Sequence, residues 1–211
     1  KRKLTSSTQN DLFQNESQQA IDFNRTTESQ PSKSVIKSAN KTSLFDNSEF
    51  LIFTNESNVY KLQNNGITSR QEILNRIAFD EGERPIYITG TTAYSGFLLT
   101  AFESGKIAKV FFDSFQTQSN RKRLKNAYNV DSKLVFIEHI ENEIDLIAIS
   151  TIDKIMLFNT GDIYPKSSTK SSGVQVLKLK GNSKLKAIKK INQVEFNDLE
   201  YYRKNIPATG N

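Results

Sequence analysis

The stretch that decides the fold is FLLTAFESGKIAKV, at residues 97–110. It opens with an apolar run interrupted by one threonine, continues through the polar sequence ESGK, and ends in an alternating run. Two such runs around a short turn that contains glycine predict a β-hairpin whose first strand is buried.

The same pattern occurs on both sides of this stretch. Residues 50–62 read FLIFTNESNVYKL, and residues 145–158 read DLIAISTIDKIMLF. Val59, Ile107 and Ile155 mark corresponding places in the three copies, and they follow one another at equal intervals along the chain. A repeat that is rich in short strands and has a period of about 48 residues predicts a bladed all-β domain.

Each hairpin is followed by a second predicted strand pair. These pairs lie at residues 73–79 with 86–88, at 124–128 with 134–137, and at 174–179 with 185–188. One blade cannot bury both of its faces, so neighbouring blades must stack. We therefore expect a bladed domain of about three four-stranded blades over residues 48–192. Three blades are few for a closed ring, so the stack is open or incomplete within this chain.

The two ends of the chain differ from this domain. Residues 1–47 are rich in Ser, Thr, Asn and Gln, which predicts a polar, poorly ordered tail or linker. A short docked strand near residues 35–36 or 44–45 is the alternative. Residues 193–211 form a C-terminal extension with an edge strand or a short helix. The chain begins at Lys1 without methionine, so we expect it to be part of a longer protein.

Composition narrows the function classes. The chain has 29 Lys and Arg against 23 Asp and Glu, a net charge of +6, which favours polyanionic partners such as nucleic acid. It has no cysteine and one histidine, so disulfides, thiolate metal sites and histidine-rich metal sites are not expected. No apolar run has the length of a membrane-spanning helix, so we predict no membrane association, no cofactor and a cytoplasmic location.

Sequence signals of catalysis are missing. The chain contains no glycine-rich phosphate loop, no Gly-x-Ser-x-Gly elbow and no His-Glu-x-x-His helix. His139 lies close to Glu138, Glu141 and Glu143, and we interpret this group as a solvated loop rather than as a catalytic base with its partners. We predict no catalytic residue and no metal ligand in this chain.

Cations are concentrated on the connections that follow the hairpins. Residues 120–126, NRKRLKN, hold four cations in five consecutive positions, and the corresponding connections of the first and third copies also carry cations. Long cationic side chains on exposed loops are suited to phosphate contacts. Our candidate DNA-binding residues are Arg70, Arg76, Arg121, Lys122, Arg123, Lys125, Lys166, Lys170, Lys178 and Lys180.

Two of these features have alternative interpretations. Lys178 and Lys180 belong to a lysine-rich final strand pair, which could equally protect an exposed sheet edge. The aromatic residues near the basic loop could stack on unpaired bases, but core packing is the more common role of such residues. These aromatic residues are Phe111, Phe112, Phe115 and Tyr128.

Several spaced motifs over residues 49–191 resemble the C-terminal domain of the A subunit of bacterial type IIA topoisomerases, DNA gyrase and topoisomerase IV. The repeat of that family opens with an apolar strand, a Thr-Asn/Lys-x-Gly turn and a second strand, which resembles LIFTNESNVYKL at residues 51–62. A later Ala/Ser-x-Gly-Val stretch before a Leu-Lys strand resembles SSGVQVLKL at residues 171–179.

The resemblance implies a β-pinwheel, a propeller-like disc whose blades exchange strands and whose basic rim binds and bends duplex DNA without sequence preference. It also implies partners in a parent enzyme: the breakage-reunion domain of the same subunit, which holds the catalytic tyrosine, and the ATPase subunit. The implied location is the bacterial cytoplasm, at the nucleoid. None of the seven tyrosines of this chain is then expected to be catalytic.

The chain also departs from the family pattern. Gyrase subunits carry a Gln-Arg-Arg-Gly-Gly-Lys-Gly box, and QSNRKR at residues 118–123 is only distantly similar to it. This favours a topoisomerase IV-like or diverged subunit. Two other functions stay open at this point: a propeller-like protein-interaction module without DNA binding, and an enzyme whose site forms only in three dimensions.

Overall fold

The structure, a computed structural model, describes residues 43–117, 121–194 and 198–211. Every described residue belongs to one compact unit, Thr42–Asn211. The alternative docked strand at residues 35–36 therefore lies outside the described residues, as does most of the predicted tail.

The described residues form three antiparallel sheets, which confirms the predicted all-β class. Sheet A has the order β3 (Pro85–Thr91), β1 (Glu49–Thr54), β2 (Val59–Gln63) and β6 (Arg123–Leu124). Sheet B has the order β7 (Leu134–Ile140), β4 (Phe97–Phe102), β5 (Lys106–Phe111) and β10 (Val174–Gln175). Sheet C has the order β11 (Leu185–Lys190), β8 (Asp145–Ser150) and β9 (Ile155–Asn159).

The hairpins β1–β2, β4–β5 and β8–β9 repeat the same turn. Ser57, Gly105 and Asp153 occupy corresponding places in the three turns and adopt left-handed φ angles of 57°, 78° and 55°. Each of these residues donates its N–H to the carbonyl three residues earlier, at 3.1, 2.9 and 3.0 Å. The repeat found in the sequence is therefore confirmed at the level of single backbone positions.

In the second and third repeats, the second strand pair is divided between two sheets, contrary to the simple blade predicted from the strand pattern. β6 belongs to the second repeat but pairs with β2 of the first, and β10 belongs to the third repeat but pairs with β5 of the second. Each connection thus returns to the free edge of the preceding hairpin and satisfies backbone groups there. This strand exchange is what the family resemblance implied.

In the first repeat, the predicted strand at residues 73–79 is wrong. The structure has the helix α2 (Arg70–Asn75) there, and the Ser69 hydroxyl accepts a hydrogen bond from the N–H of Glu72 at 3.2 Å. A serine at this position caps a helix and favours it over an extended chain. Among the described residues no hairpin precedes β1, so this segment lacks the neighbouring sheet edge that β6 and β10 have. Ile73 of α2 instead packs against Phe50 and Ile52 of sheet A.

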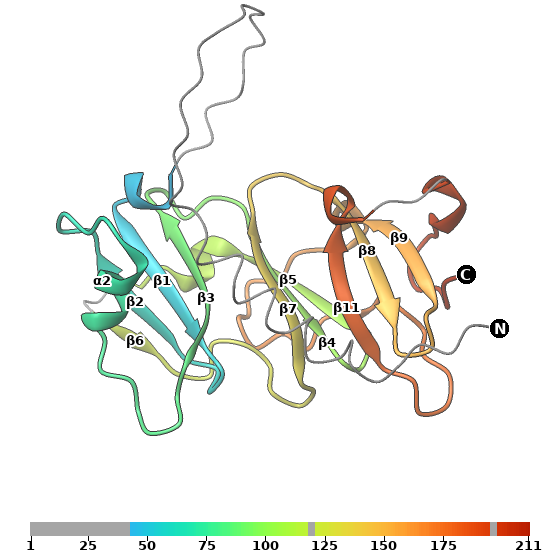
Figure 1. Cartoon of the computed structure of the whole chain (residues 1–211), viewed down its shortest axis with the longest axis horizontal. Coiled ribbons are helices and arrows are strands. Elements are labelled where there is room, and N and C mark those ends of the chain that lie inside the picture. Colours follow the sequence, from blue (N-terminus) through green and yellow to red (C-terminus); the bar gives the residue numbers. More distant parts are fainter. Residues whose placement is uncertain (1–42, 118–120, 195–197) are drawn as a thin grey trace, which may run out of the picture. The chain divides into compact units, whose positions relative to one another are not determined.

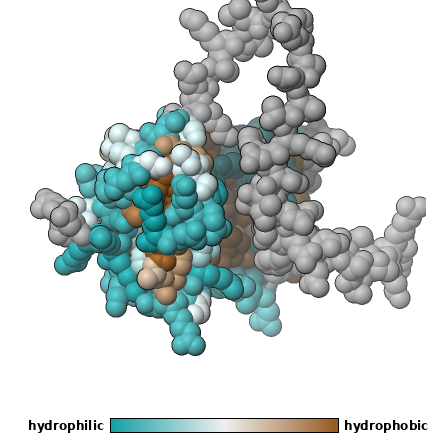
Figure 2. All heavy atoms as spheres, turned by 60° about the vertical axis from the view of Figure 1, so that its left-hand side comes forward, coloured by the Kyte–Doolittle hydropathy of each residue, from teal (hydrophilic) through white to brown (hydrophobic). Residues whose placement is uncertain are grey.

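The outer face of sheet A is covered by two segments. One contains α2, and the other is the 3-10 helix η1 (Leu44–Asp46), capped by the Ser43 hydroxyl. Leu44 and Phe45 are thus docked, but as a 3-10 helix and not as the alternative strand. Figure 2 brings this side of the molecule forward and shows it mostly hydrophilic, with smaller hydrophobic areas.

The main core lies between the sheets. Leu98 of β4 packs toward sheet A, with Leu51 and Phe53, while the next residue, Leu99, packs toward sheet C, with Met156. Successive strand residues point to opposite faces, so the middle sheet buries both. Figure 1 shows sheet B between sheets A and C.

The aromatic residues near the basic loop belong mainly to this core. Phe112 and Phe115, in the 3-10 helix η2 (Phe112–Phe115), are fully buried, and Tyr128 is buried as well. Their burial favours core packing over base stacking. Phe111 is partly exposed, and its ring lies 5.6 Å from that of Phe97.

The remaining short helices lie near sheet C. They are η3 (Thr160–Asp162), η4 (Ile191–Gln193) and η5 (Glu200–Tyr202). After η5 the chain runs beside β9, and Asn211 and Ile155 exchange two backbone hydrogen bonds, at 3.0 and 2.9 Å.

Candidate nucleic-acid interface

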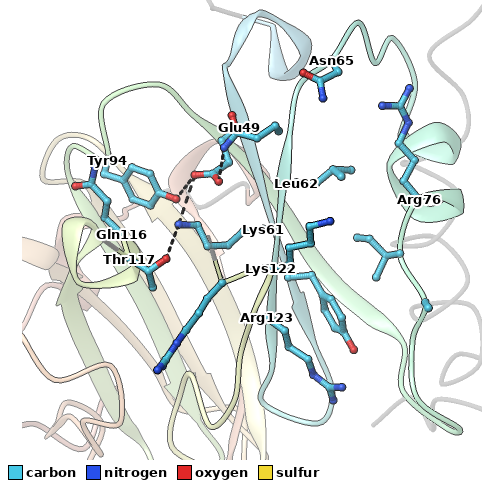
Figure 3. A pocket seen from close by; sticks show the side chains of 15 residues that line it. Glu49, Lys61, Leu62, Asn65, Arg76, Tyr94, Gln116, Thr117, Lys122 and Arg123 are labelled. Atoms are coloured by element: carbon cyan, nitrogen blue, oxygen red, sulfur yellow. Dashed lines mark hydrogen bonds and ion pairs between the residues drawn. The ribbon is translucent and has the colours of Figure 1, made fainter. Parts of the chain in front are cut away.

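An open pocket of about 710 Å³ lies along the β2–β6 edge of sheet A (Figure 3). Its floor is formed by β2 residues 60–63, one wall by residues 76–78 after α2, and the other wall by residues 116–117 and 121–123. We call it the basic groove, because connections that carry cations line both of its walls.

The basic groove brings together predicted site residues from two repeats. Arg76, the C-cap residue of α2, lines one wall, and Arg121 and Lys122, just before β6, line the other. In Figure 3, Arg76 and Lys122 lie on opposite sides of the groove. All three side chains are exposed, and within the described part of the chain none of them forms an ion pair. Their positive charges are therefore available to an anion.

The positive charge on the floor of the groove, on Lys61, is already balanced by a carboxylate. The ammonium of Lys61 lies 3.7 Å from Glu49 and donates to the Thr117 hydroxyl at 3.2 Å. The Tyr94 hydroxyl also donates to Glu49, and burial together with this carboxylate raises the pKa of Tyr94 well above its usual value. In Figure 3, Lys61 and Tyr94 converge on Glu49. The charges of Lys61 and Glu49 balance each other, so this group forms a rigid and nearly neutral part of the groove floor.

Arg123 is placed differently from its neighbours in the basic loop. Its guanidinium donates to Asp80 at 2.6 Å and to Glu83 at 3.3 Å, and lies 5.1 Å from the centre of the Tyr60 ring. These partners compensate its charge. They also attach β6 to sheet A, so Arg123 holds the segment that carries Arg121 and Lys122.

Glu83 is the centre of that attachment. Its side chain is fully buried and accepts hydrogen bonds from Thr54, Asn58 and Tyr60, each at 2.6 Å. Burial alone would raise the pKa of Glu83, but these donors outweigh it and lower the pKa to about 2. Because its oxygens are occupied by structural donors, this perturbed carboxylate serves stability rather than acid–base chemistry.

The other predicted residues lie outside the groove. Arg70, Lys125, Lys166 and Lys170 are exposed, and Lys166 lies at the edge of sheet B, where its N–H donates to the Lys109 carbonyl at 2.9 Å. Lys178 and Lys180 line a small pocket of about 80 Å³ beside the hairpin turn of sheet C, together with Lys154.

His139 does not lie in the solvated loop predicted from the sequence. It belongs to β7, and its ring stacks on Phe112 with centroids 3.9 Å apart. One ring nitrogen lies 2.8 Å from the Ser95 carbonyl. These contacts show a packing role between β7 and the segment around Gly96.

Sequence reasoning missed the buried lysines. Lys109 is buried in β5, where its ammonium donates to Glu143 and, at 3.1 Å, to the Thr160 carbonyl. Lys61 and Lys109 are one full repeat apart and so occupy the same place in two repeats. The recurrence of lysine at the same repeat position was the sequence signal that could have revealed these two residues. Both residues are paired and rigidify the sheets near the cationic edges.

The described ranges contain no group of three or more His, Asp or Glu residues positioned to hold a metal ion. Among the helices of these ranges, none has the length and apolar character needed to cross a membrane.

Comparison with known proteins identifies the fold. No protein-family model matches the chain, and no curated protein matches it in sequence. Three similar solved structures are the C-terminal domains of DNA topoisomerase IV, DNA gyrase A and E. coli ParC, with TM-scores of 0.54, 0.54 and 0.57 and identities of 18%, 19% and 13%.

These likenesses cover 68%, 77% and 78% of this chain. They cover 47%, 59% and 76% of the matched chains, so this chain spans about half the length of the first two. The predicted β-pinwheel fold and its resemblance to these domains are confirmed.

Proposed function

We propose that this chain binds duplex DNA independently of sequence, bends it and guides it to the cleavage core of a type IIA topoisomerase. The observation that carries the proposal is the basic groove, which is lined by Arg76, Arg121 and Lys122, none of which forms an ion pair with a described residue. The shared fold with topoisomerase IV and gyrase C-terminal domains supports the same function.

The chemistry of the groove suits phosphate rather than base recognition. Arg76, Arg121 and Lys122 are long, exposed and cationic, whereas the groove's aromatic residues, Tyr60 and Tyr94, are buried and already occupied by Arg123 and Lys61. Contacts to phosphates carry no sequence information, so the expected binding is uniform across sequences.

In the parent enzyme, the proposed partners are the breakage-reunion domain of the same subunit and the ATPase subunit. The breakage-reunion domain would supply the chemistry of DNA cleavage, and this chain would supply binding and bending. The proposed location is the bacterial cytoplasm, at the nucleoid. The absence of glycines from residues 118–123 favours a topoisomerase IV-like subunit over a gyrase.

The test is a titration of the full chain with two duplexes of unrelated sequence, from low to physiological salt. We expect equal affinity for both duplexes and a steep loss of affinity with salt, because counterions are released from DNA on binding. Replacing Arg76, Arg121 and Lys122 together with Gln should lower the slope of log affinity against log salt by about 2.7, or about 0.9 for each contact.

A charge-matched control separates the groove from net charge. Lys133, Lys184 and Lys186 are exposed lysines that pair with Glu103 or Asp153, away from the groove, and their triple Gln variant removes the same number of charges. The slope of this control should change much less. Equal losses in the two triple variants, or salt-independent binding, would contradict the proposal.

A second candidate function is protein binding, which one observation favours. A groove of about 390 Å³ lies between sheets A and B and is lined by Ile86 and Val130, which are 39% and 66% exposed, and by Arg84. A module that worked only through this groove would bind neither duplex in the same titration.

A further inference from the structure

The backbone positions that present Lys122 and Lys166 are related by the repeat. In sheet A, the carbonyl of Lys122 accepts from the N–H of Lys61 at 2.8 Å. In sheet B, the N–H of Lys166 donates to the carbonyl of Lys109 at 2.9 Å. Lys61 and Lys109 are one full repeat apart, so the backbones of the two exposed lysines hydrogen-bond to the same strand position on two successive sheets.

The corresponding edge position in sheet C lies beside Leu157, because Leu157 follows Lys109 by one repeat. No later repeat supplies a strand there among the described residues. The C-terminal segment fills it instead: the N–H of Lys204 donates to the Leu157 carbonyl at 3.0 Å, and Arg203 forms a parallel bridge with Leu157. Lys204 thus occupies the place in sheet C that Lys166 occupies in sheet B.

The segment is held by specific contacts. Arg203 donates to both carboxylate oxygens of Asp145, at 3.2 and 2.7 Å, and lowers the pKa of Asp145. Further along, Asn211 pairs with Ile155, and Ile206 and Ala208 pack on the core between sheets B and C. The backbone of Lys204 is therefore fixed on the edge of sheet C.

The side chain of Lys204 is available to a ligand. It is partly exposed, it forms no ion pair with any described residue, and its ammonium lies 6.0 Å from the centre of the Tyr201 ring. Stacked sheets lie about 10 Å apart, so corresponding edge positions on three sheets form a row. A row of cations along stacked sheets matches a polyanion that runs across them.

We propose that Lys204 is a DNA phosphate contact, which extends the cationic row of Lys122 and Lys166 to the third sheet, and that the C-terminal segment 203–211 presents it. This inference rests on the proposed DNA binding. It assigns a binding role to a part of the chain that the sequence left as an extension without function.

The test compares Lys204→Gln with Lys189→Gln and Lys122→Gln in the full chain, using the same two duplexes. Lys189 is a matched control, because it is also a partly exposed lysine of sheet C but lies on β11, at the opposite edge. At about 0.1 M salt, Lys204→Gln and Lys122→Gln should each weaken binding on the order of 5- to 10-fold and lower the salt slope by about 0.9. Lys189→Gln should change affinity less than about twofold.

A second variant tests presentation by the docked segment. Asp145→Asn removes the carboxylate that joins Arg203 to β8 and leaves Arg203 paired only with Glu200 of its own segment. It also raises the net charge by one, so a pure charge effect would strengthen DNA binding. If Asp145 holds Lys204 in place, this variant should bind DNA more weakly than the unmodified chain. Tighter binding would overturn the role of docking.

The outcomes separate the two proposals. If Lys122→Gln weakens binding while Lys204→Gln behaves like Lys189→Gln, the inference about Lys204 is overturned and the proposed function stands. If the unmodified chain binds neither duplex, both are overturned.

Discussion

Glu83 shows at the scale of one residue how an all-β domain holds a buried charge. Three neutral donors from sheet A and the guanidinium of Arg123 surround its carboxylate. Burial and the neighbouring carboxylate raise the pKa of Tyr60 to about 12, so its hydroxyl remains a donor at neutral pH. The carboxylate is thus stabilised in its ionised form.

This environment predicts a specific pH dependence. Because the folded-state pKa of Glu83, about 2, is below the unfolded value, its ionised form stabilises the protein above pH 4.5 or so, and this stability is lost as the pH falls toward 2. Glu83→Gln should lower the free energy of unfolding at pH 7 by on the order of 2–3 kcal/mol. Urea unfolding at several pH values measures both effects.

The exposed neighbour Glu81 provides the control. At each pH, Glu81→Gln should have nearly the same free energy of unfolding as the unmodified protein. In Glu83→Gln, the loss of stability between pH 4.5 and 2 should be smaller than in the unmodified protein. A Glu83→Gln variant as stable and as pH-sensitive as the unmodified protein would refute the interpretation of the network.

Sequence reasoning reached only part of this residue-level organisation. It grouped Arg123 with Arg121 and Lys122, because all three lie in one exposed basic run. It could not show that Asp80 and Glu83, which belong to the preceding repeat, meet Arg123, since that contact depends on the exchange of β6 into sheet A.

At the scale of elements, the exchanged strands require close approach of two backbones. Gly173, just before β10, has a φ of 75°, and a Cβ there would lie 2.3 Å from the Ile107 carbonyl. Gly181 has a φ of 55° but no heavy atom within 4 Å of such a Cβ. The two glycines share a left-handed backbone and differ in available space.

Substitution of both glycines separates these two effects. Gly181→Ala should cost about 1 kcal/mol of stability, from its backbone conformation alone. Gly173→Ala should cost at least about 3 kcal/mol, because its methyl group overlaps β5 and must displace β10. Chemical denaturation measures both, and equal losses would show that β10 does not need this close approach.

The hairpins could be predicted from the sequence, whereas the exchanged strands could not be assigned to their sheets. A hairpin is a local pairing with a visible turn, as in the stretch 97–110. β6 and β10 are very short strands, and each pairs with a strand of the preceding repeat, far from it in the sequence. The sequence predicts a strand at α2 because the apolar residues there suit either element. The prediction did not take into account that Ser69 can cap a helix.

At the scale of the whole described unit, the repeat spacing predicted the number of sheets because each repeat supplies one central hairpin. It could not predict how the stack ends, since the ends depart from the repeat. At sheet A, the outer face is covered by η1 and α2; at sheet C, the edge is completed by the C-terminal segment. Both ends of the stack are therefore completed by residues that do not follow the repeat pattern.

The stack also predicts that neighbouring residues of β4 stabilise different interfaces. Leu98 packs in the cluster shared by sheets A and B, and Leu99 packs in the cluster shared by sheets B and C; both are buried. Leu98→Ala and Leu99→Ala should each cost about 2–5 kcal/mol, because each leaves a cavity in a packed core.

Hydrogen exchange should then distinguish the two variants. In repeat architectures stability is carried by contacts between neighbours, so Leu98→Ala should mainly reduce the protection of β1 and β2, and Leu99→Ala that of β8 and β9. Each variant serves as the control for the other, since the chemical change is the same. If both variants lose protection uniformly over the three sheets, the stack unfolds as one cooperative unit. The edges of sheets A and C that we propose to bind DNA would then be stabilised together rather than separately.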